Sequence, residues 1–139
     1  MHRIFVYGTL KRGLPNHTLI QGSHFLGQAI TTERYRMIAD VFPVLLSDRS
    51  GLTVKGELYE VSTETRDRLD CLERFQGADN PHNSYDRLAT DVHYWDGTRL
   101  MPSLAEIYVG TRSRWQDAQW PQWHITNSTG QLEWPRATS

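Results

Sequence analysis

The sequence contains only one cysteine, Cys71, among its 139 residues. A single cysteine cannot form a disulfide within the chain, and no second cysteine is present to build a zinc site. This composition fits the reducing cytoplasm best. The apolar run after Met1 is too short for a signal peptide, and no run approaches the roughly 18 apolar residues of a membrane span. We therefore expect a cytoplasmic protein that has no membrane partner.

The sequence also lacks an excess of charge of either sign. Its 15 Lys and Arg residues are balanced by 16 Asp and Glu residues, which leaves a formal net charge of −1. Such a chain does not supply the basic field of a sequence-independent nucleic-acid binder. The six histidines do not have the spacing of metal ligands, and no nucleotide-binding or serine-hydrolase motif is present. We expect no nucleic-acid partner, no metal and no cofactor.

The segments that can be assigned are mostly short strands. Apolar or alternating runs predict strands at residues 4–7, 54–61, 85–95 and 104–109, with a longer loop between the last two. Pro43 limits any strand within residues 35–46 to an edge or a break. The length is typical of one domain, residues 1–139. We predict an α+β fold: a small mixed, mostly β, barrel-like single domain with few helices.

One helix is expected over residues 65–75, with Ser62 or Thr63 as its N-cap. Its apolar residues Leu69, Leu72 and Phe75 are spaced by three and should face the core. A Trp-rich tail follows from about residue 112. Its four indoles are expected to pack over the core or to form a lid, and the alternative is a ligand-stacking surface; they are Trp115, Trp120, Trp123 and Trp134.

The first candidate site is the segment Tyr7-Gly8-Thr9-Leu10, which follows the opening strand. A buried strand that ends in glycine exposes successive backbone N–H groups, which can bind an anion or a developing oxyanion. Gly8 lets a ligand approach the backbone closely, because it has no Cβ. The alternative is an ordinary turn at the end of a strand.

The predicted helix carries the second candidate, Glu73. At about 100° per residue, Glu73 lies beside Leu69 on the shoulder of the apolar arc. Partial desolvation there raises the pKa of a carboxylate, which suits a general base that must accept a proton from an amine. The alternative is a boundary glutamate that reaches solvent. Asp70 lies nearly opposite the arc, so we expect a solvated residue that pairs with Arg66 or Arg74.

Several motifs, taken in order, resemble the gamma-glutamyl cyclotransferase-like superfamily, and most closely its gamma-glutamylamine cyclotransferase branch. They cover residues 3–110 and do not include the Trp-rich tail. The matching segments are Val6-Tyr7-Gly8-Thr9-Leu10-Lys11-Arg12-Gly13, Phe42-Pro43-Val44-Leu45-Leu46, Gly56-Glu57-Leu58-Tyr59-Glu60-Val61, Leu69-Asp70-x-x-Glu73 and Tyr85-x-Arg87.

The resemblance implies a metal-independent enzyme with a small mixed β-barrel fold. In that family the α-amine of the substrate attacks its own γ-carbonyl, and the products are 5-oxoproline and a released amine. Carried over to this sequence, the resemblance makes Glu73 the general acid/base and places the glutamyl group against the backbone of residues 7–10. The remaining substrate-binding candidates are Pro43, Tyr59 and Tyr85, with strand packing as the alternative for the two tyrosines.

The identity of the substrate stays open at this point. The expected partner is a small gamma-glutamyl amine or amide. Alternatives are gamma-glutamyl amino acids, a specialised metabolite, or a non-catalytic module that binds a glutamyl-like ligand. Lys11 and Arg12 could attract a carboxylate on the leaving group, or could form a solvated edge. A barrel of this size is expected to be a monomer or a weak dimer.

Overall fold

Strands dominate the chain, as the sequence predicts. A computed structural model describes residues 1–123 and 126–135. The strands are β1 (His2–Val6), β2 (His24–Thr31), β3 (Tyr35–Ala39), β4 (Pro43–Ser47), β5 (Lys55–Val61), β6 (Tyr85–Trp95) and β7 (Leu100–Gly110). The helices are the 3-10 turn η1 (His17–Leu19), α1 (Thr63–Leu72) and the short α2 (Arg112–Trp115).

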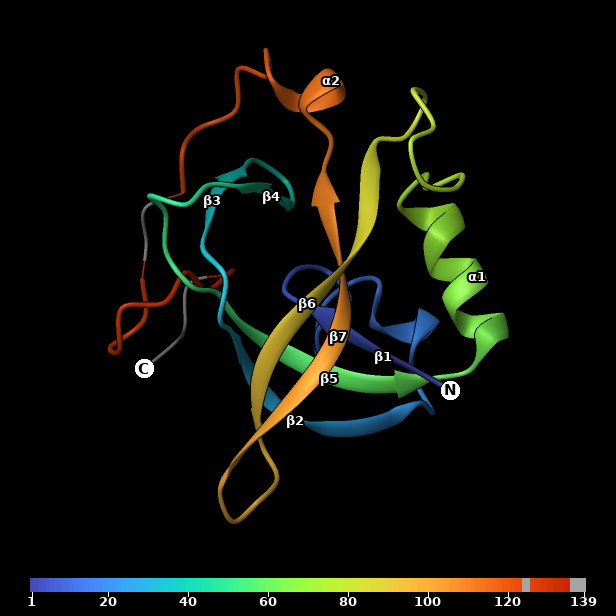
Figure 1. Cartoon of the computed structure of the whole chain (residues 1–139), viewed down its shortest axis with the longest axis vertical. Coiled ribbons are helices and arrows are strands. Elements are labelled where there is room, and N and C mark those ends of the chain that lie inside the picture. Colours follow the sequence, from blue (N-terminus) through green and yellow to red (C-terminus); the bar gives the residue numbers. More distant parts are fainter. Residues whose placement is uncertain (124–125, 136–139) are drawn as a thin grey trace.

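Five strands form a closed barrel in the order β1-β5-β2-β6-β7 (Figure 1). Strand β1 pairs antiparallel with β5 and closes the barrel by a parallel contact with β7 at Ile4 and Glu106. Strands β3 and β4 form a separate two-stranded sheet beside the barrel. The predicted α+β, mostly β, barrel-like fold with few helices is therefore confirmed.

Strand β1 is buried on both faces, as its continuous apolar run predicts. Ile4 and Val6 belong to one cluster of buried residues, while Phe5 belongs to a second cluster on the other face. The neighbouring β5 can approach closely because it carries Gly56, where an added Cβ would lie 2.2 Å from the carbonyl oxygen of Val6. Strand β1 thus lies at the centre of the core, and its position there fixes the start of the loop at residues 7–10.

Strands β6 and β7 form a long hairpin in which 11 residues of each strand are paired. The expected longer loop before residue 104 is wrong, because β7 begins at Leu100 directly after a tight turn. Asp96 builds that turn by accepting hydrogen bonds from the N–H groups of Thr98 at 2.7 Å and Arg99 at 2.9 Å. Gly97 supplies its left-handed residue, with φ of 102°.

Strand β2 had no counterpart among the predicted strands. Its pairing with β5 shifts register between Phe25 and Gly27, so the apolar residues do not alternate in a regular way. An added Cβ at Gly27 would lie 2.0 Å from the carbonyl oxygen of Trp95, so β2 passes unusually close to β6. An irregular strand of this kind has no clear period of two in its sequence.

Helix α1 begins where the sequence predicts but ends earlier. The Ser62 side chain caps it by accepting a hydrogen bond from the N–H of Thr65 at 3.1 Å. The helix ends at Leu72, so the expected continuation to residue 75 is wrong. Of the predicted apolar arc only Leu69 is fully buried, and Leu72 is 39% exposed. The reason is a left-handed residue, Arg74, with φ of 55°, which turns the chain out of the helix.

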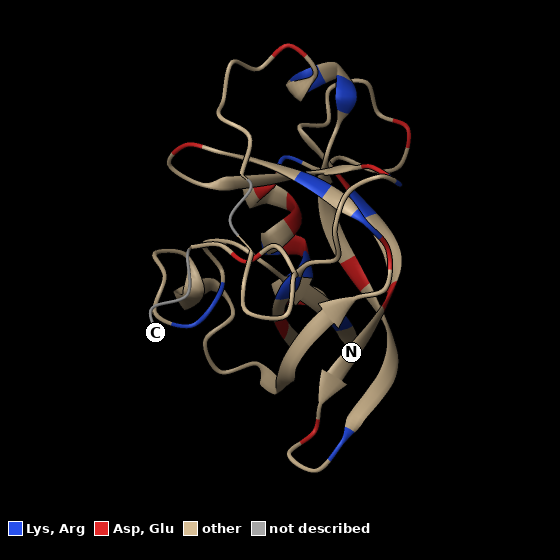
Figure 2. Cartoon of the chain, turned by 90° about the vertical axis from the view of Figure 1, so that its left-hand side faces the viewer, with Lys and Arg blue, Asp and Glu red and all other residues tan. Residues whose placement is uncertain are grey.

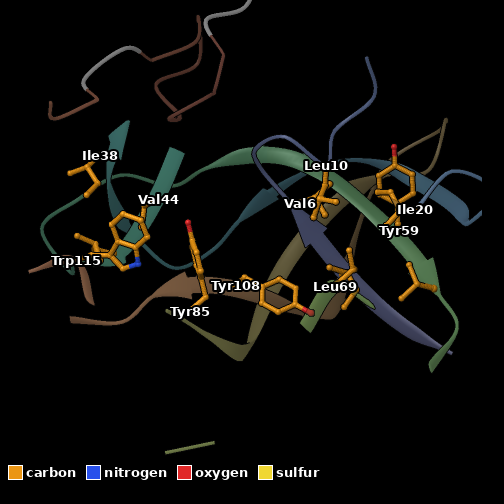
Figure 3. Packing of buried hydrophobic residues seen from close by; sticks show 13 residues of the cluster. Val6, Leu10, Ile20, Ile38, Val44, Tyr59, Leu69, Tyr85, Tyr108 and Trp115 are labelled. Carbon is orange, nitrogen blue, oxygen red and sulfur yellow. The ribbon is translucent and has the colours of Figure 1, made fainter. Parts of the chain in front are cut away.

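The Trp-rich tail covers the core at its edge, in agreement with the expected packing. Trp115 is buried and contacts Trp120, with ring centroids 5.1 Å apart. Figure 3 shows the Trp115 ring next to Val44, on the side of the core where Tyr85 lies. Trp123 and Trp134 pack against the second cluster of buried residues.

Charge is dispersed over the molecule. Basic and acidic positions are both spread over many elements of the ribbon (Figure 2). None of the helices within residues 1–123 and 126–135 is long and apolar enough to cross a membrane.

Candidate active site

A cavity of about 390 Å³ opens between the end of β1, the end of α1 and the Trp-rich tail. Its wall combines aromatic and apolar side chains with a single carboxylate and two arginines. The lining residues are Phe5, Val6, Tyr7, Gly8, Thr9, Leu10, Asn16, Phe42, Pro43, Leu72, Glu73, Arg74, Ser84, Tyr85, Tyr108, Arg114 and Trp115.

The structure brings most of the candidate residues together in this cavity. Seven of the eight line it, namely Tyr7, Gly8, Thr9, Leu10, Pro43, Glu73 and Tyr85. Tyr59 does not. It is buried beside Ile20, apart from Tyr85 and Trp115 (Figure 3). Its hydroxyl donates to the Glu57 carboxylate at 3.0 Å. The expectation that Tyr59 lines the pocket is therefore wrong, and its alternative, packing within the strand, is what the structure has.

The loop after β1 presents unused donors to the cavity. Within the described residues, the N–H groups of Gly8, Thr9 and Leu10 donate to no protein acceptor. The loop shape is fixed from outside the cavity, because the Asn16 side chain donates to the Thr9 hydroxyl at 2.8 Å and the Asn16 N–H donates to the Thr9 carbonyl at 2.9 Å. Three successive N–H groups in a fixed loop are suited to bind an anionic oxygen.

Gly8 has a second reason to be glycine. A Cβ built on it would lie 2.9 Å from Cγ of Pro43, closer than carbon atoms pack. Pro43 is the first residue of β4, and proline is tolerated at the first position of a strand. The loop and the small β3-β4 sheet therefore meet at this contact, and together they form one wall of the cavity.

Glu73 occupies the C-cap of α1, one residue past the helix. Its N–H donates to the Leu69 carbonyl at 2.9 Å, which holds it in the last turn. Burial raises the pKa of its carboxyl from 4.5 to about 7, and no hydrogen bond or ion pair from the described residues offsets that rise. The expected desolvation of Glu73 is confirmed. The carboxyl is poised to exchange protons near neutral pH.

Two tyrosines of the cavity have different roles. The Tyr7 hydroxyl donates to the Tyr108 carbonyl at 2.6 Å, so it links β7 to the loop and its proton is not available to a ligand. The buried Tyr85 forms no hydrogen bond through its hydroxyl within the part of the chain described. Burial first, and then the nearby Glu73 carboxylate, raise the pKa of Tyr85, so its hydroxyl stays protonated. Tyr85 thus offers a spare donor beside Glu73.

Asp70 is not the solvated residue that the helical phase predicts. It accepts a hydrogen bond from the Tyr108 hydroxyl at 2.5 Å and forms an ion pair with Arg87. Arg87 also binds Glu106 at 2.8 Å, and Glu106 binds Arg66 at 2.9 Å. The two direct partners of Asp70 come from β6 and β7, so they are remote in sequence from the helix. The network fixes the last turn of α1 against the barrel, one turn before Glu73.

Lys11 and Arg12 do not line this cavity. Arg12 instead stacks on Phe25, with its guanidinium carbon 3.7 Å from the ring centroid. The cations that line the cavity are Arg74 and Arg114, which the sequence analysis did not select. The signal available in the sequence was weak: Arg74 directly follows Glu73, and Arg114 precedes a tail tryptophan.

No group of three or more His, Cys, Asp or Glu residues within 1–123 and 126–135 is arranged to hold a metal ion. One of the six histidines, His124, lies outside the described residues. Cys71 is exposed and does not line the cavity. The cavity therefore contains neither a cysteine nor a histidine, and its titratable groups are one carboxylate, three tyrosines and two arginines.

The sequence matches a family model described as gamma-glutamyl cyclotransferase, AIG2-like, over residues 4–126. The chain belongs to this family. As a gamma-glutamyl cyclotransferase family member, it is 31% identical to the gamma-L-glutamyl-butirosin B gamma-glutamyl cyclotransferase of Niallia circulans, over 94% of this chain and 82% of that protein. It is 37% identical to the gamma-glutamylaminecyclotransferase of Rattus norvegicus, over 88% of this chain and 83% of the relative.

The fold of this gamma-glutamyl cyclotransferase family member also matches that of a solved relative. The crystal structure of an AIG2-like protein from Mus musculus superposes with a TM-score of 0.70 and 27% identity, covering 100% of this chain and 99% of that one. Other alignments are shorter, and the chain spans 62% of a gamma-glutamylcyclotransferase-family protein of Methanocaldococcus jannaschii.

Proposed function

We propose that the protein is a cyclotransferase that cleaves a gamma-glutamyl amine or amide. The α-amine of the substrate attacks its own γ-carbonyl, a five-membered ring closes, and 5-oxoproline and the free amine are released. The observation that carries this proposal is Glu73: a carboxyl without polar partners, with a pKa of about 7, in a cavity beside a row of unused N–H donors.

Glu73 has the properties of the proton carrier for this reaction. An α-ammonium has a pKa of about 7.7–8.0, so proton transfer to a carboxylate of pKa about 7 is nearly balanced. In the proposed step the ammonium first releases one proton to solvent, and the neutral amine nitrogen then forms a bond to the γ-carbon while a second proton passes from it to Glu73. The same proton then moves to the leaving nitrogen as the amide bond breaks. The carboxylate is regenerated, and Glu73 neither gains nor loses a proton overall.

The loop after β1 supplies the second element of the reaction. When the nitrogen attacks, the γ-carbonyl oxygen becomes an oxyanion, and fixed N–H donors stabilise it without reorganising. The N–H groups of Gly8, Thr9 and Leu10 are available for this oxyanion and for the glutamyl carboxylate. Tyr85 is proposed to hold the substrate with its spare hydroxyl, and Pro43 to form the apolar wall.

The described cavity lining contains no cysteine and no histidine that could activate a hydroxyl, which agrees with a reaction whose nucleophile belongs to the substrate. The activities for which the Niallia circulans and Rattus norvegicus relatives are named support the same reaction class.

The proposal is tested by incubating the protein with gamma-glutamyl amines, gamma-glutamyl-ε-lysine and gamma-glutamyl amino acids, and by detecting 5-oxoproline by mass spectrometry. We expect turnover of at least one compound and loss of most of the rate in Glu73→Gln. Binding of these compounds without any 5-oxoproline would instead identify a non-catalytic binding module. Full turnover by Glu73→Gln would remove Glu73 from the mechanism.

A further inference from the structure

The two arginines of the cavity have no carboxylate partner within the described residues. The ion pairs of the structure include neither Arg74 nor Arg114, although four other arginines, Arg3, Arg66, Arg68 and Arg87, each contact an acidic side chain. Glu73 is the single acidic residue among the lining residues. When Glu73 carries a proton, the lining therefore has two positive charges and no negative one.

Arg114 is held at the cavity wall by stacking. Its guanidinium carbon lies 4.4 Å from the centroid of the Trp115 ring, within the range of a cation–π contact. Trp115 is itself fixed, because its indole N–H donates to the Ser84 carbonyl at 2.8 Å. The charge of Arg114 acts on the Tyr85 phenol, where it opposes the rise in pKa that burial and Glu73 cause. Arg114 is thus close to the spare hydroxyl of the site.

Arg74 has a backbone conformation that favours glycine. It lies directly after the C-cap of α1 with φ of 55°, where a non-glycine residue is strained by about 1 kcal/mol. Its carbonyl accepts a hydrogen bond from the Ser84 N–H at 3.3 Å, which ties this turn to the start of β6. An arginine at a position that suits glycine better indicates a use for its side chain.

Neither arginine pairs with the reacting carboxyl, because no ion pair among the described residues includes Glu73. Both guanidinium groups can therefore bind an anionic group of a ligand. The wall near them is apolar, with Trp115, Phe42 and Leu72. This part of the cavity suits a group that combines an apolar side chain with a negative charge.

We propose that Arg74 and Arg114 form a subsite for a carboxylate on the leaving amine, so that the preferred substrate is a gamma-glutamyl amino acid with an apolar side chain. This inference rests on the proposed cyclotransferase function and selects, among the substrates considered above, gamma-glutamyl amino acids over gamma-glutamyl amines. A leaving amine that is itself cationic is disfavoured, because the same arginines repel it. Phe42 and Trp115 receive the apolar side chain.

Two matched compounds test the subsite: gamma-glutamyl-phenylalanine and gamma-glutamyl-phenethylamine, which differ only in the carboxylate of the leaving amine. We expect kcat/KM to be at least about tenfold higher for the first, because a charge-assisted hydrogen bond is lost in the second. Arg114→Gln should lower kcat/KM for gamma-glutamyl-phenylalanine by about tenfold and leave the phenethylamine compound within about twofold.

Arg112→Gln is the matched control. It removes the same charge from the same short helix, but Arg112 does not line the cavity, so both compounds should react as in the unaltered protein. Arg74→Gly, like Arg114→Gln, should lower kcat/KM for gamma-glutamyl-phenylalanine and not for the phenethylamine compound. Its Tm should not fall, because glycine relieves the strained backbone. A selective loss in Arg74→Gly therefore cannot be attributed to unfolding.

Calorimetry with Glu73→Gln separates this inference from the proposed function. If no 5-oxoproline forms from any compound, the cyclotransferase proposal fails, while the affinities of the two compounds still report on the subsite. Tighter binding of gamma-glutamyl-phenylalanine that depends on Arg114 supports the subsite. Equal affinity for the two compounds, or an equal loss of both in Arg114→Gln, overturns it, because the arginine would then contact the shared glutamyl part or nothing.

Discussion

Replacing Glu73 with glutamine should change activity and stability in opposite directions. The pKa of Glu73 rises from 4.5 to about 7 on folding because its carboxyl is buried. Each pKa unit corresponds to about 1.36 kcal/mol, so keeping Glu73 ionised in the folded state costs at most about 3 kcal/mol. Glutamine has nearly the same shape and never carries that charge. The variant should therefore be the more stable protein wherever Glu73 is ionised.

The dependence on pH follows from linkage. Between pH 4.5 and 7 the folded protein holds a proton on Glu73 that the unfolded chain has released, so stability falls as pH rises through this window. Below pH 4.5 Glu73 is protonated in both the folded and the unfolded state, so the variant has no stability advantage over the parent protein. Above pH 7 the free energy of unfolding of the variant exceeds that of the parent by the full amount, about 3 kcal/mol, which corresponds to a Tm higher by several degrees.

Thermal unfolding at pH 5 and pH 8, together with a 5-oxoproline assay, checks both effects. The loss of a general acid/base should reduce kcat by about 10²–10⁴-fold. In the parent protein kcat/KM should fall below about pH 7, because the protonated carboxyl cannot accept the proton of the amine. A Tm for the variant that is lower at pH 8 than that of the parent would refute the reasoning, since it would mean that the ionised carboxylate has favourable partners.

Three further changes test the rest of the site. Gly8→Ala should raise KM and lower stability by about 1 kcal/mol, because its Cβ would meet the Pro43 ring at 2.9 Å; steady-state kinetics and urea unfolding measure both. Arg87→Ala should lower stability by about 2 kcal/mol, because it leaves Asp70 without its partner, and Arg87→Lys should restore only part of it in the same unfolding assay. Tyr85→Phe should lower kcat/KM about tenfold, whereas Tyr59→Phe should leave KM unchanged, since Tyr59 does not line the cavity; equal effects would contradict this assignment of the two hydroxyls.

The parts of the site that follow from local sequence could be predicted. The buried strand β1 and the glycine after it are neighbours in the chain, so one apolar run locates the loop with Gly8. Glu73 could be selected over Asp70, although the physical reason differs from the one expected. The helical phase assumes a helix through residue 75, whereas the helix ends at Leu72 and the C-cap turn is what carries Glu73 to the cavity.

The parts that depend on distant partners could not be predicted. A helical projection treats Asp70 as exposed, because its partner Arg87 is 17 residues away on a strand. Tyr59 was expected in the pocket because it belongs to a matching motif. Its hydroxyl instead donates a hydrogen bond to the buried Glu57, two residues earlier. Arg114 contributes to the cavity only because the tail folds back over β4, which no periodicity in the tail indicates.

The parallel contact that closes the barrel also sets an order of assembly. Strand β1 is synthesised before its partners β5 and β7, and the acceptor of the Tyr7 hydroxyl lies 101 residues later in the chain. Contacts of such large sequence separation form slowly, because a long loop must be closed first. The Tyr7 side chain beside the proposed oxyanion donors is therefore tied down only after residue 108 has been synthesised, so a nascent chain that ends before this residue lacks the complete site.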